Sequence, residues 1–354
     1  MKLTKKTLNN IFFLCGVAAV VVMMLTFDVS FTQLWQHLCY AGYWMVPIVG
    51  IWFVVYAINA WSWRCVMQGN LTDDDRRQGE RIPGFWRNLR LTITGYALNY
   101  ATPVGGLGGE PYRIMELSKD MSNQHATSSV ILYAMMHIFA HIWLWFTSVF
   151  LYLALVLIGD LPLTPPVAII LTLIAAFCLA AFYVFAKGYK HGLVLKVLGW
   201  VGRIPGLKGC SRRFTERHRE SLLNIDSQIA ALHRQDKRAF YASLLLEYLS
   251  RIVQSLEILF MLLLFDIDCG GGTTGLLLNF AHSILILAFT SLFANIIGFL
   301  PMQLGVQEGG FVLSIAALGL SAALGIFVSI ICRVREIIWI LIGIILMKME
   351  RSEK

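Results

Sequence analysis

The fold is decided by residues 127–158, TSSVILYAMMHIFAHIWLWFTSVFLYLALVLI, which contain no Asp, Glu, Lys or Arg. A helix needs about 20 mostly apolar residues to cross the hydrocarbon core of a bilayer, and this run exceeds that length. Other apolar runs occupy residues 11–27, 43–66, 167–186, 239–265, 275–300 and 309–347. Peptide groups inside a bilayer must find their hydrogen bonds within the protein, so these runs predict an all-α, polytopic integral membrane protein.

The composition supports the same class of protein. Of the 354 residues, 57% are hydrophobic and 14% are charged, and the mean hydropathy is +0.68. A soluble domain has about 25% charged residues. Because no small-residue cleavage site follows the 11–27 run, we expect a retained first helix rather than a signal peptide. The 309–347 run is long enough for two passes, which gives about eight transmembrane helices in a single integral membrane domain, 1–354.

Lys and Arg gather on one side of the expected membrane. The N-terminus, the 67–92 loop and the 187–238 segment are basic, whereas residues 28–42, 159–166 and 266–275 contain neither Lys nor Arg. By the positive-inside rule, the basic segments and both chain ends are predicted to be cytoplasmic, in a multi-pass protein of the cell (inner) membrane. Topology and contact with anionic lipid headgroups account for the net charge of +8, so we expect no nucleic-acid partner.

Two short segments share an unusual design. Residues 103–110, PVGGLGGE, and residues 301–308, PMQLGVQE, each run from a proline to a glutamate at the same spacing beside apolar runs. Non-helical backbone at membrane depth is tolerated only where it is buried in protein or lines a cavity. Paired helix breaks in the two halves of a membrane protein are typical of transporter sites. We therefore expect broken or re-entrant segments near 93–113 and 300–310, in a parallel or an inverted repeat.

The first segment lies within residues 85–120, whose two ends are both expected in the cytoplasm. This region begins with Arg87 and Arg90, and it returns to Lys119 and Asp120. Its middle is apolar enough to enter the membrane, so the pattern predicts a re-entrant hairpin with residues 103–109 near the tip. The alternative is an amphipathic segment that lies on the membrane surface.

The second segment precedes the last apolar run. We expect the chain to cross through about 306–320 and to return through about 321–347, which places Arg333 near the middle of the membrane. In the alternative, residues 309–331 and 334–347 are separate spans, and Arg333 and Arg335 lie in an outer loop. That loop would be the only exception to the charge asymmetry, so the first arrangement is favoured.

Each of the two segments ends in a carboxylate that begins the next helix. Glu110 and Glu308 would be stabilised there by the helix dipole, and a simple helix start is the alternative to a functional role. Free peptide groups at the break would form a polar site for an ionic headgroup. Arg113 could contact a phosphate, with Arg333 as its counterpart. The candidate substrate-binding residues are Pro103, Gly105, Gly108, Gly109, Glu110, Arg113, Pro301, Gly305, Glu308 and Arg333.

Further ionisable residues interrupt the expected fifth span. Each charge in a bilayer costs about 2.5–3.5 kcal/mol on insertion scales, so such residues indicate pairing or function. Glu247 and Arg251, spaced i,i+4, could neutralise each other or line a polar cavity. Glu257 has no partner nearby in the sequence, and we expect Arg333 to reach it across the fold.

His137 and His141 face one way in the third span. Their spacing suits two zinc ligands, but no third ligand is visible in the sequence, so interhelical hydrogen bonding is favoured and no metal or other cofactor is expected. The sequence also has no GxSxG motif and no Walker A lysine. A transporter is therefore favoured over an enzyme.

At these residues the chain resembles the lysylphosphatidylglycerol synthase transmembrane family, a flippase-like membrane module. The resemblance rests on Thr102-Pro103-x-Gly105-Gly106-x-Gly108-Gly109-Glu110-Pro111-x-Arg113, on Leu300-Pro301-x3-Gly305-Val306-x-Glu308, and on Arg333. It extends from the first helix to the last. The family's suggested role is to move or handle lipids, including aminoacylated phospholipids where a synthetase domain is fused. Residues 1–354 contain no such domain, so aminoacyl transfer is not expected. The first motif also lacks a basic residue that many relatives carry between proline and glycine.

Three functions remain open at this point. The leading hypothesis is a lipid translocase that handles a phospholipid or lipid-linked molecule, with a possible partner enzyme that supplies the lipid. The second is a membrane-embedded transferase or an accessory subunit in lipid modification, similar to a phosphatidylglycerol lysyltransferase by the family's name. The third is an ion-coupled transporter of small solutes.

Overall fold

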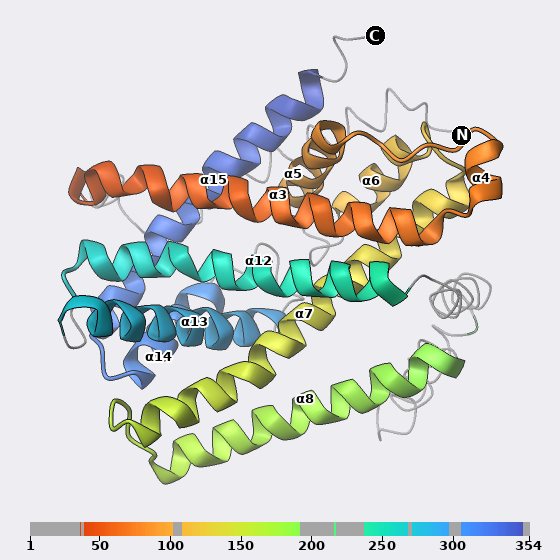
Figure 1. The fold of residues 1–354 in the computed structure, drawn as a ribbon. Helices are drawn as coiled ribbons and strands as arrows, with labels where there is room; N and C mark the ends of the chain where they lie inside the picture. The colour runs from red at the N-terminus through yellow and green to blue at the C-terminus, as the bar shows by residue number, and fades with distance from the viewer. Residues whose placement is uncertain are drawn as a thin grey trace.

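The computed structural model describes residues 36, 39–101, 108–191, 216, 237–267, 271–296 and 306–349. Every regular element in these ranges is a helix, which confirms the all-α prediction (Figure 1). The elements are the 3-10 turn η1 (Gly42–Trp44) and the helices α3 (Met45–Asn70), α4 (Asp73–Arg77), α5 (Phe85–Ala101), α6 (Gly109–Leu117), α7 (Asn123–Leu157), α8 (Pro165–His191), α12 (Lys237–Leu264), α13 (Gly272–Ile296), α14 (Val306–Ala317) and α15 (Ala322–Met349).

Four of the described helices are long and apolar enough to cross a membrane: Cys39–Asn70, Asn123–Leu157, Pro165–Phe185 and Gly272–Asn295. Helices α12 and α15 each have 28 residues and are about 42 Å long, but ionisable side chains interrupt their apolar sequence. The polytopic membrane architecture is therefore confirmed. The expected first span, 11–27, lies outside the described residues, as does most of the 187–238 segment.

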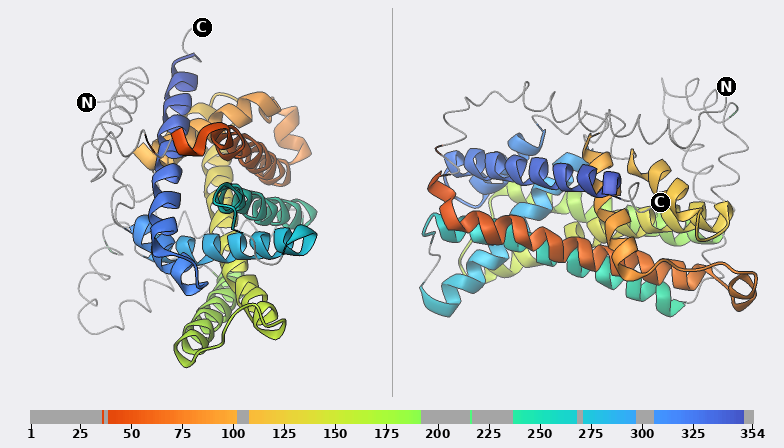
Figure 2. Two further views of the ribbon diagram at one scale, coloured as in Figure 1. Left: turned by 90° about the vertical axis from the view of Figure 1, so that its left-hand side faces the viewer. Right: turned by 90° about the horizontal axis from the view of Figure 1, so that it is seen from above.

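Among the described helices, α3 and α12 pack against each other most extensively. They lie side by side and run antiparallel (Figure 1). Helix α7 crosses beneath α3 and α12 and also packs against α13. Helix α8 contacts mainly α7 and extends with it away from the other helices (Figure 2). Rings from α7 and α8 stack there, with the centroids of Phe139 and Phe185 4.0 Å apart. Much of the remaining surface of α8 is apolar and exposed, as expected of a lipid-facing helix.

Helices α5 and α6 pack against each other as a helical hairpin. At its open end, Arg87 forms an ion pair with Asp120, and the Arg81 N–H donates to the Asp120 carbonyl over 2.9 Å. Near its closed end, an added Cβ at Gly109 would lie 2.0 Å from the Gly95 carbonyl oxygen, so only glycine permits this approach. Residues 102–107, which connect the two helices, lie outside the described part of the chain.

The hairpin lies inside the bundle. Leu91 and Leu98 of α5 are buried, and α5 packs along α3 and α15. The backbone of α15 comes close to α5 at Gly343, where an added Cβ would lie 2.4 Å from the Cβ of Ala97. Each face of α5 is thus in contact with another helix.

The C-terminal region divides into helices where the favoured arrangement places them, whereas the crossing through 306–320 and the depth of Arg333 stay predictions, because α14 has only 12 residues. Helix α14 ends at Ala317, the chain turns through Gly319 at a φ of +77°, and α15 then continues without a break through Arg333 and Arg335. Both arginines are buried, so the alternative that placed them in an outer loop is wrong. The tight turn also depends on Gly325, where an added Cβ would lie 2.6 Å from the Cα of Val312.

Candidate functional site

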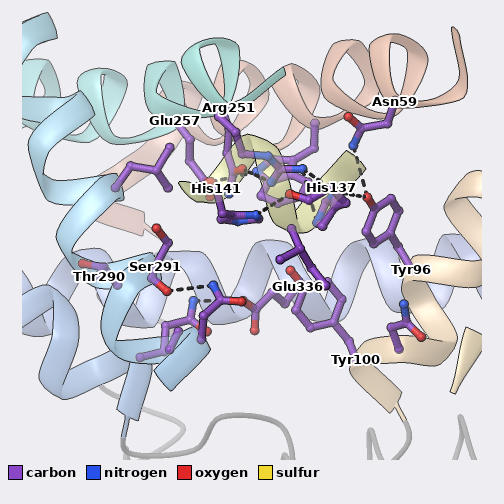
Figure 3. A pocket seen from close by; sticks show the side chains of 18 of the residues that line it. Asn59, Tyr96, Tyr100, His137, His141, Arg251, Glu257, Thr290, Ser291 and Glu336 are labelled. Atoms are coloured by element: carbon purple, nitrogen blue, oxygen red, sulfur yellow. Dashed lines mark hydrogen bonds between the residues drawn. The ribbon is translucent and has the colours of Figure 1, made fainter. Parts of the chain in front are cut away.

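A polar cavity of about 470 Å³ lies within the bundle, among α3, α5, α6, α7, α12, α13, α14 and α15. Figure 3 shows polar side chains that converge on it from several of these helices. The ionisable side chains that line it include Glu110, Arg113, His137, His141, Arg251, Glu257, Arg335 and Glu336. A cavity of this charge in an apolar bundle is costly, which points to function.

The first proline-to-glutamate segment reaches the cavity through Glu110, in the first turn of α6. Asn99 of α5 holds this helix start, because its Oδ1 accepts from the Gly109 N–H over 2.6 Å. Its Nδ2 donates to Glu110 Oε1 over 3.1 Å. Arg113 Nη1 donates to the same carboxylate oxygen over 3.3 Å. Glu110 is therefore a helix start, as predicted, whose carboxylate also faces the cavity.

Arg113 is buried against aromatic rings. Its guanidinium carbon lies 4.8 Å from the ring centroid of Tyr96, 5.5 Å from that of Tyr133 and 5.6 Å from that of Trp63. An added Cβ at Gly95 would lie 2.0 Å from Arg113 Nε, so the side chain lies directly over this glycine. Cation–π contacts stabilise a guanidinium where water is excluded.

The second segment reaches the cavity through Gln307, next to Glu308 in the first turn of α14. Glu308 Oε1 accepts from Arg333 Nε over 2.8 Å, and Arg333 Nη1 donates to Glu336 Oε2 over 2.8 Å. Gln307 Nε2 donates to Glu336 Oε1 over 3.0 Å. Glu308 and Arg333 thus lie directly behind Glu336, which lines the cavity.

The predicted pairing of Glu257 with Arg333 is wrong. Glu257 pairs with Arg335, whose Nε and Nη2 donate to its two carboxylate oxygens over 2.8 and 3.2 Å. Trp52 Nε1 donates to Glu257 Oε2 over 2.7 Å, and the Arg335 guanidinium lies 3.9 Å from the Trp52 ring centroid. Two residues along a helix correspond to a rotation of about 200°, so Arg333 reaches α14 while Arg335 reaches α12.

A further cluster joins α7 and α12 beside the cavity, and it consists of His137, Glu247 and Arg251. His137 Nδ1 lies 2.9 Å from Glu247 Oε2, and Arg251 Nη2 lies 3.5 Å from the same oxygen. Glu247 and Arg251 therefore pair with each other, and of the two Arg251 lines the cavity while Glu247 lies behind it. His137 makes interhelical hydrogen bonds, as predicted, whereas His141 Nδ1 donates to the His137 carbonyl over 3.0 Å. Within the described ranges, no group of three or more potential ligands could hold a metal ion.

The structure brings most of the predicted residues to one place. Six of them line the cavity: Glu110, Arg113, His137, His141, Arg251 and Glu257. Glu247, Glu308 and Arg333 are each bonded directly to a lining residue. Gly108 and Gly109 are buried at the start of α6. Pro103, Gly105, Pro301 and Gly305 lie outside the described residues.

Sequence reasoning missed several residues that line the cavity. Glu336 follows Arg333 at i,i+3, and this spacing is a signal for a helical ion pair that could have found it. The sequence pattern places Arg335 only in the outer loop of the alternative arrangement. Asn99, Tyr96 and Trp52 carry no such signal, because their roles depend on contacts with distant helices.

The fold and the cavity define a polytopic α-helical membrane protein with a charged internal site. The family model described as "Lysylphosphatidylglycerol synthase TM region" matches residues 12–343, nearly the whole chain. The chain belongs to this family, as its motifs predicted. No curated protein and no solved structure matched the chain significantly.

Proposed function

We propose that this protein is a lipid translocase, which moves a phospholipid or lipid-linked molecule between the two leaflets of the membrane. The polar headgroup occupies the cavity between α6 and α14, while the acyl chains remain in the bilayer. The observation that carries the proposal is that the helix starts of both proline-to-glutamate segments border one charged cavity.

The size of the cavity suits a headgroup. Small-molecule sites commonly have volumes of about 300–1,000 Å³. The cavity, at about 470 Å³, is at the lower end of this range and has room for a headgroup without its acyl chains. Exposed apolar side chains on α7, α8 and α13 supply a surface along which acyl chains can remain in lipid.

The charges of the cavity suit an ionic headgroup. Arg113, Arg251 and Arg335 present guanidinium groups to it, and guanidinium is well matched to phosphate oxygens. Buried arginine Nε atoms at Arg113 and Arg251 have no hydrogen-bond partner among the described residues. A headgroup phosphate would supply acceptors to such donors, because unpaired buried donors cost about 1–3 kcal/mol each.

The break between α5 and α6 fits a re-entrant segment. The two ends of this hairpin lie together beside Asp120, and Lys and Arg are common at that end of the molecule. On the proposed orientation that end, and both chain termini, face the cytoplasm. A headgroup would then reach Glu110 from within the membrane, and a separate enzyme would supply the lipid.

The direct test is lipid movement in liposomes that contain the purified protein. Glu110→Gln and Glu308→Gln remove one carboxylate from each segment, and Asp74→Asn is a matched control because Asp74 is 82% exposed on α4. A hydrogen bond to a charged group contributes about 1.5–3 kcal/mol, so we expect transport to be slower by about tenfold or more in each of these two variants. The rate is measured by quenching of a fluorescent phospholipid in the outer leaflet.

Unchanged transport in well-folded Glu110→Gln and Glu308→Gln proteins would contradict the site assignment. Current that depends on a small solute, with no movement of lipid, would favour the small-solute transporter instead.

A membrane-embedded transferase is a second candidate, favoured by the contact between His137 and Glu247. An imidazole paired with a carboxylate can act as a general base on a lipid hydroxyl. This function predicts a chemically altered lipid. Mass spectrometry of lipids from cells with and without the protein separates it from transport, which changes only the leaflet in which the lipid is found.

A further inference from the structure

Among the described residues, the ion network around the cavity contains one more carboxylate than guanidinium groups. It consists of the lining residues and the side chains that are linked to them through one or two successive ion pairs. The carboxylates are Glu110, Glu247, Glu257, Glu308 and Glu336, and the guanidinium groups are those of Arg113, Arg251, Arg333 and Arg335. Residues 102–107 and 297–305, which adjoin the cavity in sequence, contain no ionisable side chain. With neutral histidines the network therefore has one unit of excess negative charge. The pairs Glu110–Arg113 and Glu247–Arg251 are balanced, so the excess lies in the linked group of Glu257, Glu308, Glu336, Arg333 and Arg335.

His137 marks where a proton can bind beside the cavity. Its Nδ1 has three polar neighbours: Tyr96 OH at 2.9 Å, Glu247 Oε2 at 2.9 Å and Arg251 Nη2 at 3.0 Å. Arginine can only donate, so the contact with Arg251 requires a bare Nδ1. An ionised Glu247 can only accept, so the contact with Glu247 requires a proton on Nδ1.

These two requirements are met by two arrangements that differ by one proton. In the first, Glu247 is protonated and donates to Nδ1, which can also accept from Arg251. In the second, Nδ1–H donates to the Glu247 carboxylate and Nε2 is bare, so Arg251 Nη2 can donate to Nε2 over 3.4 Å and also pair with Glu247 through the 3.5 Å contact. The first arrangement has one more proton than the second, and it leaves the Arg251 guanidinium as a net positive charge at the cavity, which also contains the carboxylates of Glu257 and Glu336.

Among the residues that the structure describes, Glu247 is the one carboxylate in contact with His137. The titratable and charged groups that face it are Tyr96 from α5, Arg113 from α6, Tyr133 and His141 from α7, and Glu247 and Arg251 from α12; Arg335 and Glu336 of α15 lie across the cavity. Glu247 is fully buried, and its Oε1 has no hydrogen-bond partner within the described part of the chain. His141 Nδ1 is used as a donor, which leaves its Nε2 as an acceptor beside the cavity for a moving proton.

We infer that Glu247 and His137 form a proton-binding site, and that proton exchange at this site is coupled to passage of the headgroup through the cavity. The coupling rests on the proposed lipid transport, whereas the proton site stands on the geometry alone. Arg251 is the connecting group, because it lines the cavity and contacts both members of the pair. A headgroup anion that draws Arg251 away would favour a proton at Glu247, and release of the anion would favour loss of the proton.

Proton uptake tests the site without any lipid. Purified full-length protein in weakly buffered detergent solution is titrated between about pH 5 and pH 8 with a pH-indicator dye, in the range where histidine pairs titrate. The wild type should take up about one proton more than Glu247→Gln. Asp74→Asn, which changes an exposed carboxylate on α4, should take up as much as the wild type. His137→Asn is a second variant in case Glu247→Gln fails to fold, and it should also lose this uptake.

Wild-type uptake in both Glu247→Gln and His137→Asn would overturn the proton site. The coupling is tested in vesicles of phosphatidylethanolamine and phosphatidylglycerol, with fluorescent phosphatidylethanolamine as the probe. A pH gradient should change its rate of movement several-fold in the wild type and not in Glu247→Gln. A wild-type rate of lipid movement that does not change with the pH gradient would overturn the coupling while leaving the transport proposal intact. Proton uptake without any lipid movement would support the site and contradict the transport proposal.

Discussion

The two proline-to-glutamate segments have the same spacing but are stabilised in different ways. In the first, Glu110 and its arginine lie on one helix, and the hairpin is held by contact between Gly95 and Gly109. In the second, Glu308 and its arginine come from two helices and belong to a larger network. Close backbone packing therefore fixes the first helix start, whereas ion pairs fix the second. A repeated sequence pattern can thus specify a position without specifying the interactions that support it.

The largest expected loss of stability concerns the ion pairs around the second proline-to-glutamate segment, which we call the second region; the first region is the hairpin around Glu110. Arg335→Gln leaves Glu257, which is 3% exposed, as an uncompensated buried charge, and this should cost about 3–5 kcal/mol in unfolding free energy. Arg113→Gln should cost less, because Glu110 is 17% exposed to the cavity and keeps its bond from Asn99. Unfolding in mixed detergent micelles measures both values.

The double variant Arg335→Gln/Glu257→Gln is the control for this prediction. It removes both charges, so much of the lost stability should return. Equal losses for Arg335→Gln and Arg113→Gln would break the proposed difference between the two regions.

The next largest effect concerns the backbone packing of the first region. Gly109→Ala places a methyl group 2.0 Å from the Gly95 carbonyl oxygen, so the hairpin must open, at a cost of about 1–3 kcal/mol. Gly309→Ala is the matched change at the start of α14, where no atom of the described residues lies within 4 Å of the added Cβ. It should leave thermal stability nearly unchanged. Similar losses of melting temperature for the two variants would contradict the proposal that close backbone packing fixes the first helix start but not the second.

The smallest effect concerns the neutral amides that support each carboxylate. Asn99→Ala removes two hydrogen bonds, one to Glu110 and one to the Gly109 N–H, and should cost about 2 kcal/mol. Gln307→Ala removes one bond to Glu336, which keeps Arg333, and should cost about 1 kcal/mol. Both are measured by the same unfolding assay. If Gln307→Ala lost more unfolding free energy than Asn99→Ala, the second helix start would also depend on a side-chain amide.

Much of the candidate site was accessible from the sequence, because ionisable residues are conspicuous in apolar runs. The high cost of a charge in a bilayer identifies four of these residues from the sequence: Glu247, Glu257, Arg251 and Arg333. The sequence does not indicate that Glu257 pairs with Arg335 rather than with Arg333. Which of Arg333 and Arg335 faces α12 depends on how α15 is rotated in the bundle, and neighbouring helices set that rotation.

The sequence by itself determined the membrane class, the helical fold and the positions of the two broken segments, because hydrocarbon imposes length and hydrogen-bonding rules that can be read residue by residue. The tertiary structure decided that both helix starts border one cavity and that Arg335 pairs with Glu257. It also decided that His137 lies between a carboxylate and a guanidinium. These features join helices far apart in the chain, and the contacts that select them form only when the helices pack.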